Sequence, residues 1–407
     1  MNKGLTKISE IILEISMGPF GSDIKVDNFV ETGVPVLNGA NLPKFKLLEK
    51  EFRYVTAEKA KTFRKAIAKR GDIVITHRGT IGQISYIPEN SKFEEYVISQ
   101  SQFRVDLNKK LVDPAFFVYY FHTNEGQKRL LANKCHVGVP ALAQATTNFR
   151  LIEIPLPSLP TQQNIASVLS SLDSKIELNN RINADLEAMA KTLYDYWFVQ
   201  FDFPDKNGKP YKTSGGKMVW NEALKREIPE GWEISSVNDL LIKYSDKSIH
   251  IDSKQILKKG KYPVITQDNG DYISGFTNEE NPINEIPLIV FGDHSCTLRY
   301  IDFPFFRGAD GTQLMYFGDN LTIFIFIYLK SVINQLPGYG KYERHFKYLK
   351  EFKILVPESR KLKDFQIQLE PIFKKISKSR LENQKLAELR DWLLPMLMNG
   401  QVKVSER

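Results

Sequence analysis

The sequence predicts an α+β protein in which two globular α+β domains are joined by two long antiparallel coiled-coil helices, as a pseudo-two-fold repeat. Three observations lead to this fold class. One helix-length segment occurs twice at a constant offset of 200 residues, as from Ile176 to Ile376. Both copies carry the heptad spacing of a coiled-coil seam. The segments ahead of the two copies also echo one another, as 234–240 echoes 5–11.

The repeated segment runs from about Gln162 to Phe198. The same residue recurs 200 positions later for Leu169, Lys175, Ile176, Asn183, Leu186 and Leu193. The register extends upstream, where Ile154 and Pro157 correspond to Ile354 and Pro357. Because chance matches would not keep one offset over a whole helix, we interpret the segment as an internal repeat.

Each copy carries apolar and amide residues at alternating four- and three-residue steps. In the first copy these are Leu172, Ile176, Asn179, Asn183, Leu186, Ala190, Leu193 and Trp197. In the second they are Ile372, Ile376, Ser379, Asn383, Leu386, Arg390, Leu393 and Leu397. A lone amphipathic helix would be an ordinary core helix, but two matching seams indicate helices that pack on each other. An asparagine in a seam costs stability and specifies register, so Asn183 and Asn383 are the predicted register residues.

Length and composition set wide bounds. The chain has 407 residues, 42% of them hydrophobic, which leaves room for two or three domains. A formal net charge of +8 suits a polyanionic partner without proving one. Two cysteines exclude a disulfide framework and a thiolate-rich zinc site. No signal peptide opens the chain, and the longest apolar run, 321–329, is too short to span a bilayer. We therefore expect a cytoplasmic protein with no membrane partner.

The first domain is predicted to occupy residues 1–157. Strands are expected at 34–37, 72–76, 84–87 and 103–107, and one helix at 114–131. Four polar, glycine-bearing loops lie between them, at 18–25, 76–83, 99–102 and 135–149. Loops of this kind on a rigid scaffold are typical of binding sites. A proline-rich run then separates the domain from the first long helix, 158–203.

The rest of the chain restarts the same plan. A polar stretch rich in Lys, Gly and Ser, 204–216, is predicted to be a linker. The second domain, 217–357, contains 263–265, which echoes 35–37, and 287–291, the counterpart of 71–75. The second helix follows at 358–407. The domains have diverged in loop length while the helices kept theirs, which indicates that helix geometry is under constraint.

The loops carry side chains suited to DNA. A two-fold protein can read two half-sites of a duplex, with Arg and Lys on guanine, Asn and Gln on adenine, and other cations on phosphates. The first domain offers Lys25, His77, Arg78, Thr80, Gln83, Gln100, Gln102, His136 and Gln144. The second offers Gln267, Asn269, His294, Arg307, Gln313, Tyr339, Lys341, Tyr342, Arg344 and His345. Arg78 and Arg344 are the first candidates for base readers.

The segment 338–345 interleaves aromatic, cationic and glycine residues and is expected to lie just before a strand. Solvated polar loops, or a basic hairpin, would give a similar pattern. These alternatives stay open for each single residue.

Catalytic motifs are not found. An amino-methyltransferase needs a [DNS]-P-P-[YFW] loop, and the nearest segments, 302–305 and 202–205, lack the second proline. No G-x-x-x-x-G-K-[ST] phosphate loop occurs, and the six histidines have no metal-ligand spacing. We therefore expect a non-catalytic chain with no cofactor and no metal. The alternatives are a single-chain nuclease or methyltransferase with unrecognised motifs, and a coiled-coil adaptor for proteins alone.

Several motifs together resemble the specificity (S) subunits of type I restriction–modification systems over essentially the full length. They are Pro155-Leu-Pro-Ser-Leu-Pro-Thr-Gln-Gln163, Leu172-Asp173, Asn183, Trp197-Phe198, Phe201-Asp-Phe-Pro204, Gly208-Lys-Pro-Tyr211, Ser214-Gly-Gly216, Ile228-Pro-Glu-Gly-Trp-Glu233, Arg390-Asp-Trp-Leu-Leu-Pro395 and Asn399-Gly400. Two departures are visible. The N-terminus lacks a Pro-x-Gly-Trp motif like that of 229–232, and Pro371 and Pro395 predict a second helix that is shorter or kinked.

The resemblance implies two target recognition domains, each reading one half of a bipartite double-stranded DNA site, with the two helices as a ruler between them. It implies that the helices dock two modification subunits, which carry S-adenosylmethionine and methylate adenine. Restriction subunits with ATP-driven translocation would join that core. None of this chemistry would reside in the present chain.

Overall fold

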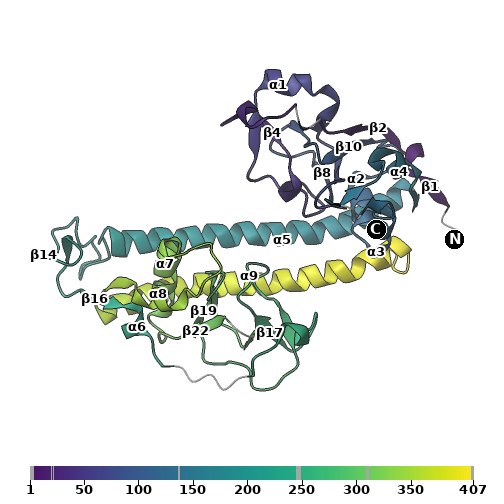
Figure 1. Cartoon of the computed structure of the whole chain (residues 1–407). Helices are drawn as coiled ribbons and strands as arrows, with labels where there is room; N and C mark the ends of the chain where they lie inside the picture. Colours follow the sequence, from purple (N-terminus) through teal and green to yellow (C-terminus); the bar gives the residue numbers. More distant parts are fainter. Residues whose placement is uncertain are drawn as a thin grey trace. The chain divides into compact units, whose positions relative to one another are not determined.

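The computed structural model describes residues 4–19, 21, 23–135, 138–243, 249–308 and 311–404. Its contacts divide the chain into two compact units, Met1–Ser174 with Leu386–Arg407, and Lys175–Lys385. We call these unit 1 and unit 2. Both long helices contribute residues to both units (Figure 1). None of the helices in the described ranges is long and apolar enough to cross a membrane.

The two long helices are α5 (Leu159–Tyr194, 36 residues) and α9 (Ser359–Asn399, 41 residues). Helix α5 starts inside the proline-rich run, with Pro160 in the first turn, where a missing N–H costs nothing. Of the two expectations for the second helix, shorter or kinked, the first is wrong, because α9 is longer than α5 and contains both Pro371 and Pro395. An internal proline costs about 3 kcal/mol. Both prolines are exposed, so their rings lie away from the seam. The packing of the buried seam residues of α9 is therefore kept, and it offsets that cost.

The predicted seam lies on the buried side of both helices, since every one of its positions is buried or half-buried. Within unit 2, Asn179 Nδ2 donates to Asn383 Oδ1 at 2.8 Å, and Arg380 pairs with Glu187 at 2.6 Å. Higher numbers on α5 thus meet lower numbers on α9, which makes this part of the pair antiparallel. Asn383 bonds Asn179 and not its repeat equivalent, Asn183. In an antiparallel pair, equivalent positions coincide only at the centre of the repeat.

Asn183 gives a test of the seam. Its Oδ1 atom is buried and has no hydrogen-bond partner among the described residues. Asn183→Leu should therefore raise the free energy of unfolding by about 1–3 kcal/mol, the cost of a buried unsatisfied polar group. Asn383→Leu, which breaks the bonds to Asn179 and Asn180, should lower it by about 0.5–1.5 kcal/mol. Urea unfolding followed by circular dichroism measures both, and equal effects of the two variants would contradict the seam geometry.

Unit 1 is built on two sheets. An antiparallel sheet has the order β2-β10-β7-β8, with bounds Ile12–Met17, Gln102–Leu107, Ile73–Thr76 and Ile84–Tyr86. A five-stranded sheet has the order β3-β5-β4-β9-β6, with bounds Phe29–Val30, Arg53–Val55, Val34–Val36, Glu95–Val97 and Ile67–Lys69. Two short pairs complete the strands: β1 (Leu5–Lys7) with β13 (Glu153–Pro155), and β11 (Lys134–Cys135) with β12 (Ala141–Leu142).

Unit 2 repeats this plan in its strand order. Strand β19 (Leu288–Gly292) lies between β22 (Thr312–Met315) and β20 (Leu298–Ile301), as β7 lies between β10 and β8. Strand β16 (Glu233–Ser236) pairs with β23 (Lys353–Val356), as β1 pairs with β13. The remaining strands are β17 (Tyr262–Ile265), β18 (Gly275–Thr277), β21 (Phe306–Arg307), β14 (Met218–Asn221) and β15 (Arg226–Pro229). The segments that echo in sequence therefore occupy equivalent strands.

The helix predicted at 114–131 is two helices, α2 (Pro114–Phe121) and α3 (Asn124–Leu130). Thr123 caps α3 by accepting a hydrogen bond from Gly126 N at 3.0 Å, which ends the helical run before it. The other short helices are α1 (Ala57–Thr62), α4 (Ala145–Leu151), α6 (Val237–Leu240), α7 (Thr322–Val332) and α8 (Phe346–Glu351). The 3-10 turns are Ile8–Glu10, Val26–Asn28, Gly39–Asn41, Arg64–Ala66, Ser253–Gln255 and Ile333–Gln335, and a π turn, Asp195–Val199, follows α5.

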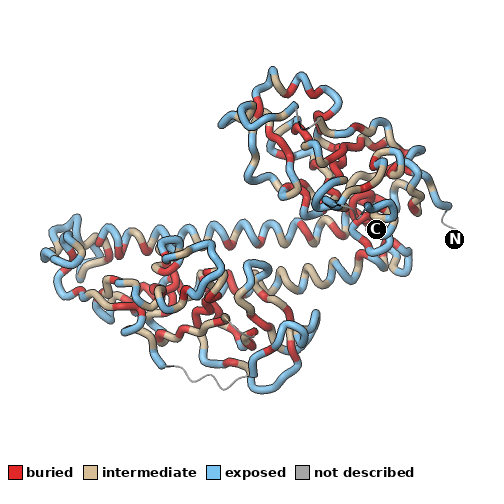
Figure 2. The backbone as a smooth tube through the Cα atoms, viewed as in Figure 1, coloured by how far each residue is buried: buried red, intermediate tan, exposed pale blue. Residues whose placement is uncertain are grey.

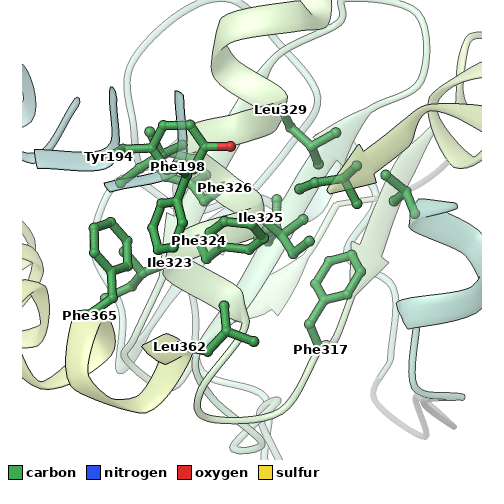
Figure 3. Packing of buried hydrophobic residues seen from close by; sticks show 14 of the residues in the cluster. Tyr194, Phe198, Phe317, Ile323, Phe324, Ile325, Phe326, Leu329, Leu362 and Phe365 are labelled. Carbon is green, nitrogen blue, oxygen red and sulfur yellow. The ribbon is translucent and has the colours of Figure 1, made fainter. Parts of the chain in front are cut away.

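Each unit has its own apolar core, drawn in red within the units in Figure 2. In unit 2, the end of α5 and the start of α9 pack on α7 (Figure 3). The ring of Phe198 lies edge-on to Phe324 and to Phe365, with centroids 4.8 and 4.7 Å apart. These large buried rings join the sheet region of unit 2 to its part of the helix pair.

The connection at 204–216 is ordered by hydrogen bonds and is not a free linker. The Asp202 carboxylate accepts from Thr213 N at 2.8 Å and from Thr213 Oγ1 at 2.7 Å, and these bonds hold its pKa below the usual range. The ring of Phe203 stacks with the rings of Tyr211 and Trp232, with centroids 4.6 and 5.2 Å away. Lys, Gly and Ser in this segment therefore mark tight turns and a solvated face.

Candidate DNA-reading loops

The four loops predicted in the first domain meet at one end of the β10-β7-β8 sheet. His77 N donates to Ser101 O at 2.9 Å, and Gly79 N donates to Pro140 O at 2.9 Å. Gly18 N donates to Gln102 O at 2.8 Å. We call the described residues of 18–25, 77–83, 99–102 and 140–144 loop cluster 1. Loops far apart in sequence thus form one surface on a rigid sheet, which is where binding residues are commonly placed.

Most of the candidates in loop cluster 1 reach solvent. Lys25, Arg78, Thr80 and Gln144 are exposed, and His77 and Gln83 are half-buried. The Arg78 guanidinium makes no hydrogen bond or ion pair with any residue that the structure describes, so it is available to a ligand. Thr80 Oγ1 donates to Gln83 Oε1 at 2.8 Å, which fixes the turn between β7 and β8. His136 lies outside the described residues.

His77 has a structural contact beside its candidate role. Its Nε2 faces Gln100 O at 3.2 Å, and burial lowers the pKa of the imidazole. The side chain therefore braces the 99–102 loop.

Gln102 is wrong as a DNA-binding candidate. It is the first residue of β10, its side chain is 0% exposed, and its Oε1 accepts from Ser99 N at 3.0 Å. Alternate residues of a strand face opposite sides, and this amide points into the unit. It shapes the 99–102 loop from below.

Unit 2 assembles an equivalent surface, loop cluster 2, from the described residues of 266–271, 293–297, 307–313 and 337–345. His294 N donates to Gln267 Oε1 at 3.1 Å, and Asp293 N donates to Gly311 O at 2.7 Å. His345 N donates to Asp293 O at 3.1 Å, which joins the last loop to the others. The 293–297 turn follows β19 as the 77–83 turn follows β7, so the two clusters occupy the same place on repeated sheets.

The candidates in loop cluster 2 divide into exposed residues at its surface and half-buried residues beneath them. Asn269, Tyr339, Lys341 and Arg344 are exposed, whereas Gln267, Arg307 and Gln313 are half-buried. Arg299 was not singled out from the sequence, yet it is the buried brace of this surface, because its guanidinium donates to Thr266 O at 2.6 Å and to Asp268 O. The sequence feature that could have identified it is a cation among the apolar residues of a strand, Leu298–Ile301.

His345 is also wrong as a DNA contact. Its imidazole is 0% exposed, with Nδ1 facing Pro337 O at 3.1 Å and Nε2 facing Lys341 O at 3.3 Å. It holds the 337–345 loop closed from inside. The segment 338–345 precedes helix α8 and not a strand, because Asp293 Oδ1 accepts from Phe346 N at 2.7 Å and so caps that helix.

Both clusters present cations, amides and aromatic rings on loops, the groups that contact phosphates and base edges of DNA. No group of three or more His, Cys, Asp or Glu side chains that could hold a metal ion occurs among the described residues.

Comparisons with known proteins find similar chains among DNA specificity subunits. Residues 26–188 match the model of the type I restriction modification DNA specificity domain. The type I restriction enzyme MjaIX specificity subunit of Methanocaldococcus jannaschii is 27% identical over 378 residues, which span 87% of this chain and 83% of that protein. The HindI specificity subunit of Haemophilus influenzae is 22% identical over 411 residues, spanning 83% and 88%.

The fold has a counterpart among solved structures. The type I restriction–modification system S subunit from M. genitalium superposes with a TM-score of 0.56 at 18% identity, covering 100% of this chain and 98% of that chain. This likeness confirms the predicted α+β fold class. The relatives are named specificity subunits, which agrees with the prediction that the chain is not an enzyme. In sequence and fold, this chain is similar to the specificity subunits of type I restriction–modification systems.

Proposed function

We propose that the chain reads a bipartite double-stranded DNA site, with residues 1–157 reading one half and residues 217–357 reading the other. The observation that carries this proposal is the duplication of the loop surface. Loop clusters 1 and 2 follow equivalent strands, yet their side chains differ. The turn after β7 carries Arg78 and Thr80, whereas the equivalent turn after β19 is Asp293–Thr297. Two equivalent surfaces with different side chains suit two half-sites of different sequence.

The helix pair is the proposed docking site for two modification subunits, which would carry S-adenosylmethionine and methylate adenine, with restriction subunits joining that core. Unit 2 supports this with a groove of about 740 Å³ between α5 and α9, lined by Met189, Tyr196 and Ile372. Met189 and Tyr196 are exposed there. Contiguous exposed apolar side chains on a helix pair are typical of protein interfaces.

Exchange of one recognition domain tests the proposal. Residues 217–357 would be replaced by the corresponding region of a relative with a known target, and the modified adenines would be located by sequencing DNA from cells that express the complex. We expect one half-site to change to that of the relative and the other to stay. The reciprocal exchange of 1–157 is the control, and a change in both halves after either exchange would contradict separate readout.

A further inference from the structure

The side chain of Tyr342 projects from loop cluster 2. It is 85% exposed, the largest exposed fraction of any large apolar or aromatic side chain in the described ranges. Aromatic rings gain most when they are buried, and exposed ones are enriched at binding surfaces. Tyr342 therefore needs an explanation that the fold of the loop does not supply.

The ring of Tyr342 is held flat against the imidazole of His294. Their centroids are 4.4 Å apart and their planes differ by 10°. His294 Nδ1 lies 3.0 Å from Glu343 O, and since a carbonyl oxygen only accepts, Nδ1 carries the proton of this bond. The imidazole thus covers one face of the tyrosine ring and leaves the other face open to solvent.

The stacked pair is braced before any ligand binds. The backbone N of His294 donates to Gln267 Oε1 at 3.1 Å. The 337–345 loop is closed by Lys341 N donating to Gly338 O at 2.8 Å and by the buried His345 beneath it. Gly338 has φ +71°, and a Cβ there would come within 2.6 Å of Glu343 Oε2. Because the loop is already ordered, a ligand that binds to the ring pays little conformational entropy.

We propose that the Tyr342–His294 pair is a one-sided stacking platform for a single unstacked nucleobase of the DNA target, which rests on the proposed function. Intercalation between two base pairs would need both faces of the ring, and His294 occupies one. A base that leaves the stack, in contrast, needs only one aromatic face. Lys341 and Arg344 flank the ring on the same loop and are exposed, so they are placed to hold the phosphates beside that base.

A thermodynamic cycle tests this stacking contact. The full chain, assembled with its modification subunits, would be titrated with duplexes that carry the target and with duplexes in which each nucleotide of the second half-site is made abasic in turn. Tyr342→Ala should weaken binding of the intact target by about 5- to 150-fold, the range of one base–aromatic stack. The loss should vanish for the duplex that is abasic at one position, because that duplex has no base to stack.

Two further variants separate stacking from other roles. Tyr342→Phe keeps the ring and should bind as the wild type, and Trp220→Ala removes a ring that is 59% exposed on β14, outside loop cluster 2, and should also bind as the wild type. Equal binding by Tyr342→Ala and wild type, a loss with Tyr342→Phe, or a loss that persists on every abasic duplex would each overturn the platform. A wild-type complex with no sequence preference would instead refute the proposed function itself, so the two failures are distinguishable.

Discussion

Lengthening α5 and α9 together by one turn should increase the gap between the two half-sites of the DNA target by one to two base pairs, with both half-site sequences unchanged. The insertions belong at matched points, between Asn183 and Leu186 and between Asn383 and Leu386. One turn adds about 5.4 Å, and a base pair rises about 3.4 Å. Each proposed recognition domain leads directly into the N-terminus of one helix, α5 after β13 and α9 after β23. A longer helix pair should therefore displace the recognition surfaces along the duplex.

Sequencing of modified adenines gives the spacer length for the wild type and the lengthened chain. The control is an insertion in α5 alone. That change moves Asp173 out of register with its partner Arg390, a pair that the matched insertion keeps together, so it should lower the melting temperature and the yield of assembled complex. A matched insertion that leaves the spacer at its original length would refute the ruler.

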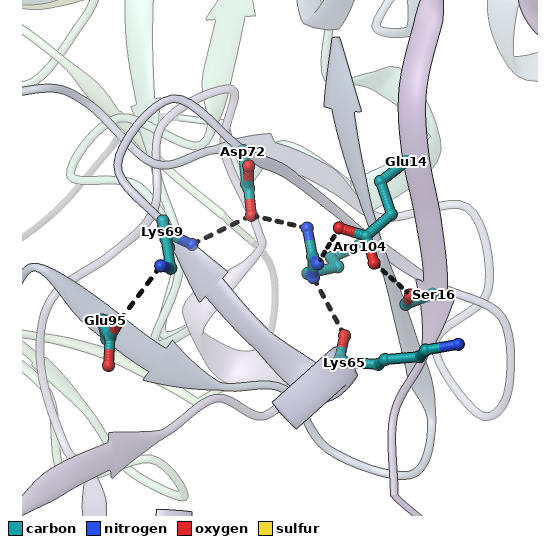
Figure 4. A network of polar contacts seen from close by, with 7 residues as sticks. All are labelled: Glu14, Ser16, Lys65, Lys69, Asp72, Glu95 and Arg104. Atoms are coloured by element: carbon teal, nitrogen blue, oxygen red, sulfur yellow. Dashed lines mark hydrogen bonds and ion pairs between the residues drawn. The ribbon is translucent and has the colours of Figure 1, made fainter. Parts of the chain in front are cut away.

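Arg104→Met should destabilise the first domain by about 3–5 kcal/mol, the cost of leaving a buried charge without its partner. Arg104 is a buried residue of β10 whose guanidinium bonds Asp72 Oδ2 at 3.2 Å, Glu14 Oε2 at 2.5 Å and Lys65 O at 3.0 Å (Figure 4). Asp72 is itself buried, and its other bond in the network comes from Lys69 N at 3.0 Å. Methionine fills the space of the stem but removes all the donors. Urea unfolding measures the loss.

The stability lost in the Arg104→Met variant should grow with pH. Burial raises the pKa of Asp72 to about 6, above its ordinary value of 3.8, although Arg104 acts in the opposite direction. A raised carboxyl pKa means that stability from the protonated form is present at low pH and declines as the pH rises through about 6. Without Arg104 the pKa of Asp72 should rise further, so the gap between variant and wild type should be larger at pH 8 than at pH 5.

Two comparisons isolate the buried charge as the cause. Arg104→Met combined with Asp72→Asn should recover part of the loss, because no unpaired carboxylate remains. Lys109→Met breaks the exposed pair with Glu89, 2.7 Å apart, and should cost at most about 1 kcal/mol. A loss for Lys109→Met as large as that for Arg104→Met would show that the buried network has no special energetic role.

The sequence by itself determined the repeated architecture. Residues that face a core recur at the period of the helix or strand that carries them. The seam from Leu172 to Trp197 and the echoing strands could therefore be recognised from the sequence alone. The grouping of polar residues into loops was also visible, because glycine and polar runs between strands mark chain reversals. Arg78 and Arg344 came from this reasoning, and their roles at individual bases stay predictions.

The tertiary structure alone decided which polar side chains face outward. Gln102 and His345 have the same chemistry as the exposed candidates, but each lies under a loop that arrives from a distant part of the chain. It also decided that Asn383 meets Asn179, and that Tyr342 stacks on His294 some fifty residues away. A periodic pattern relates only residues that are close along the chain. Whether one polar group is buried depends on contacts between distant segments, which no local pattern predicts.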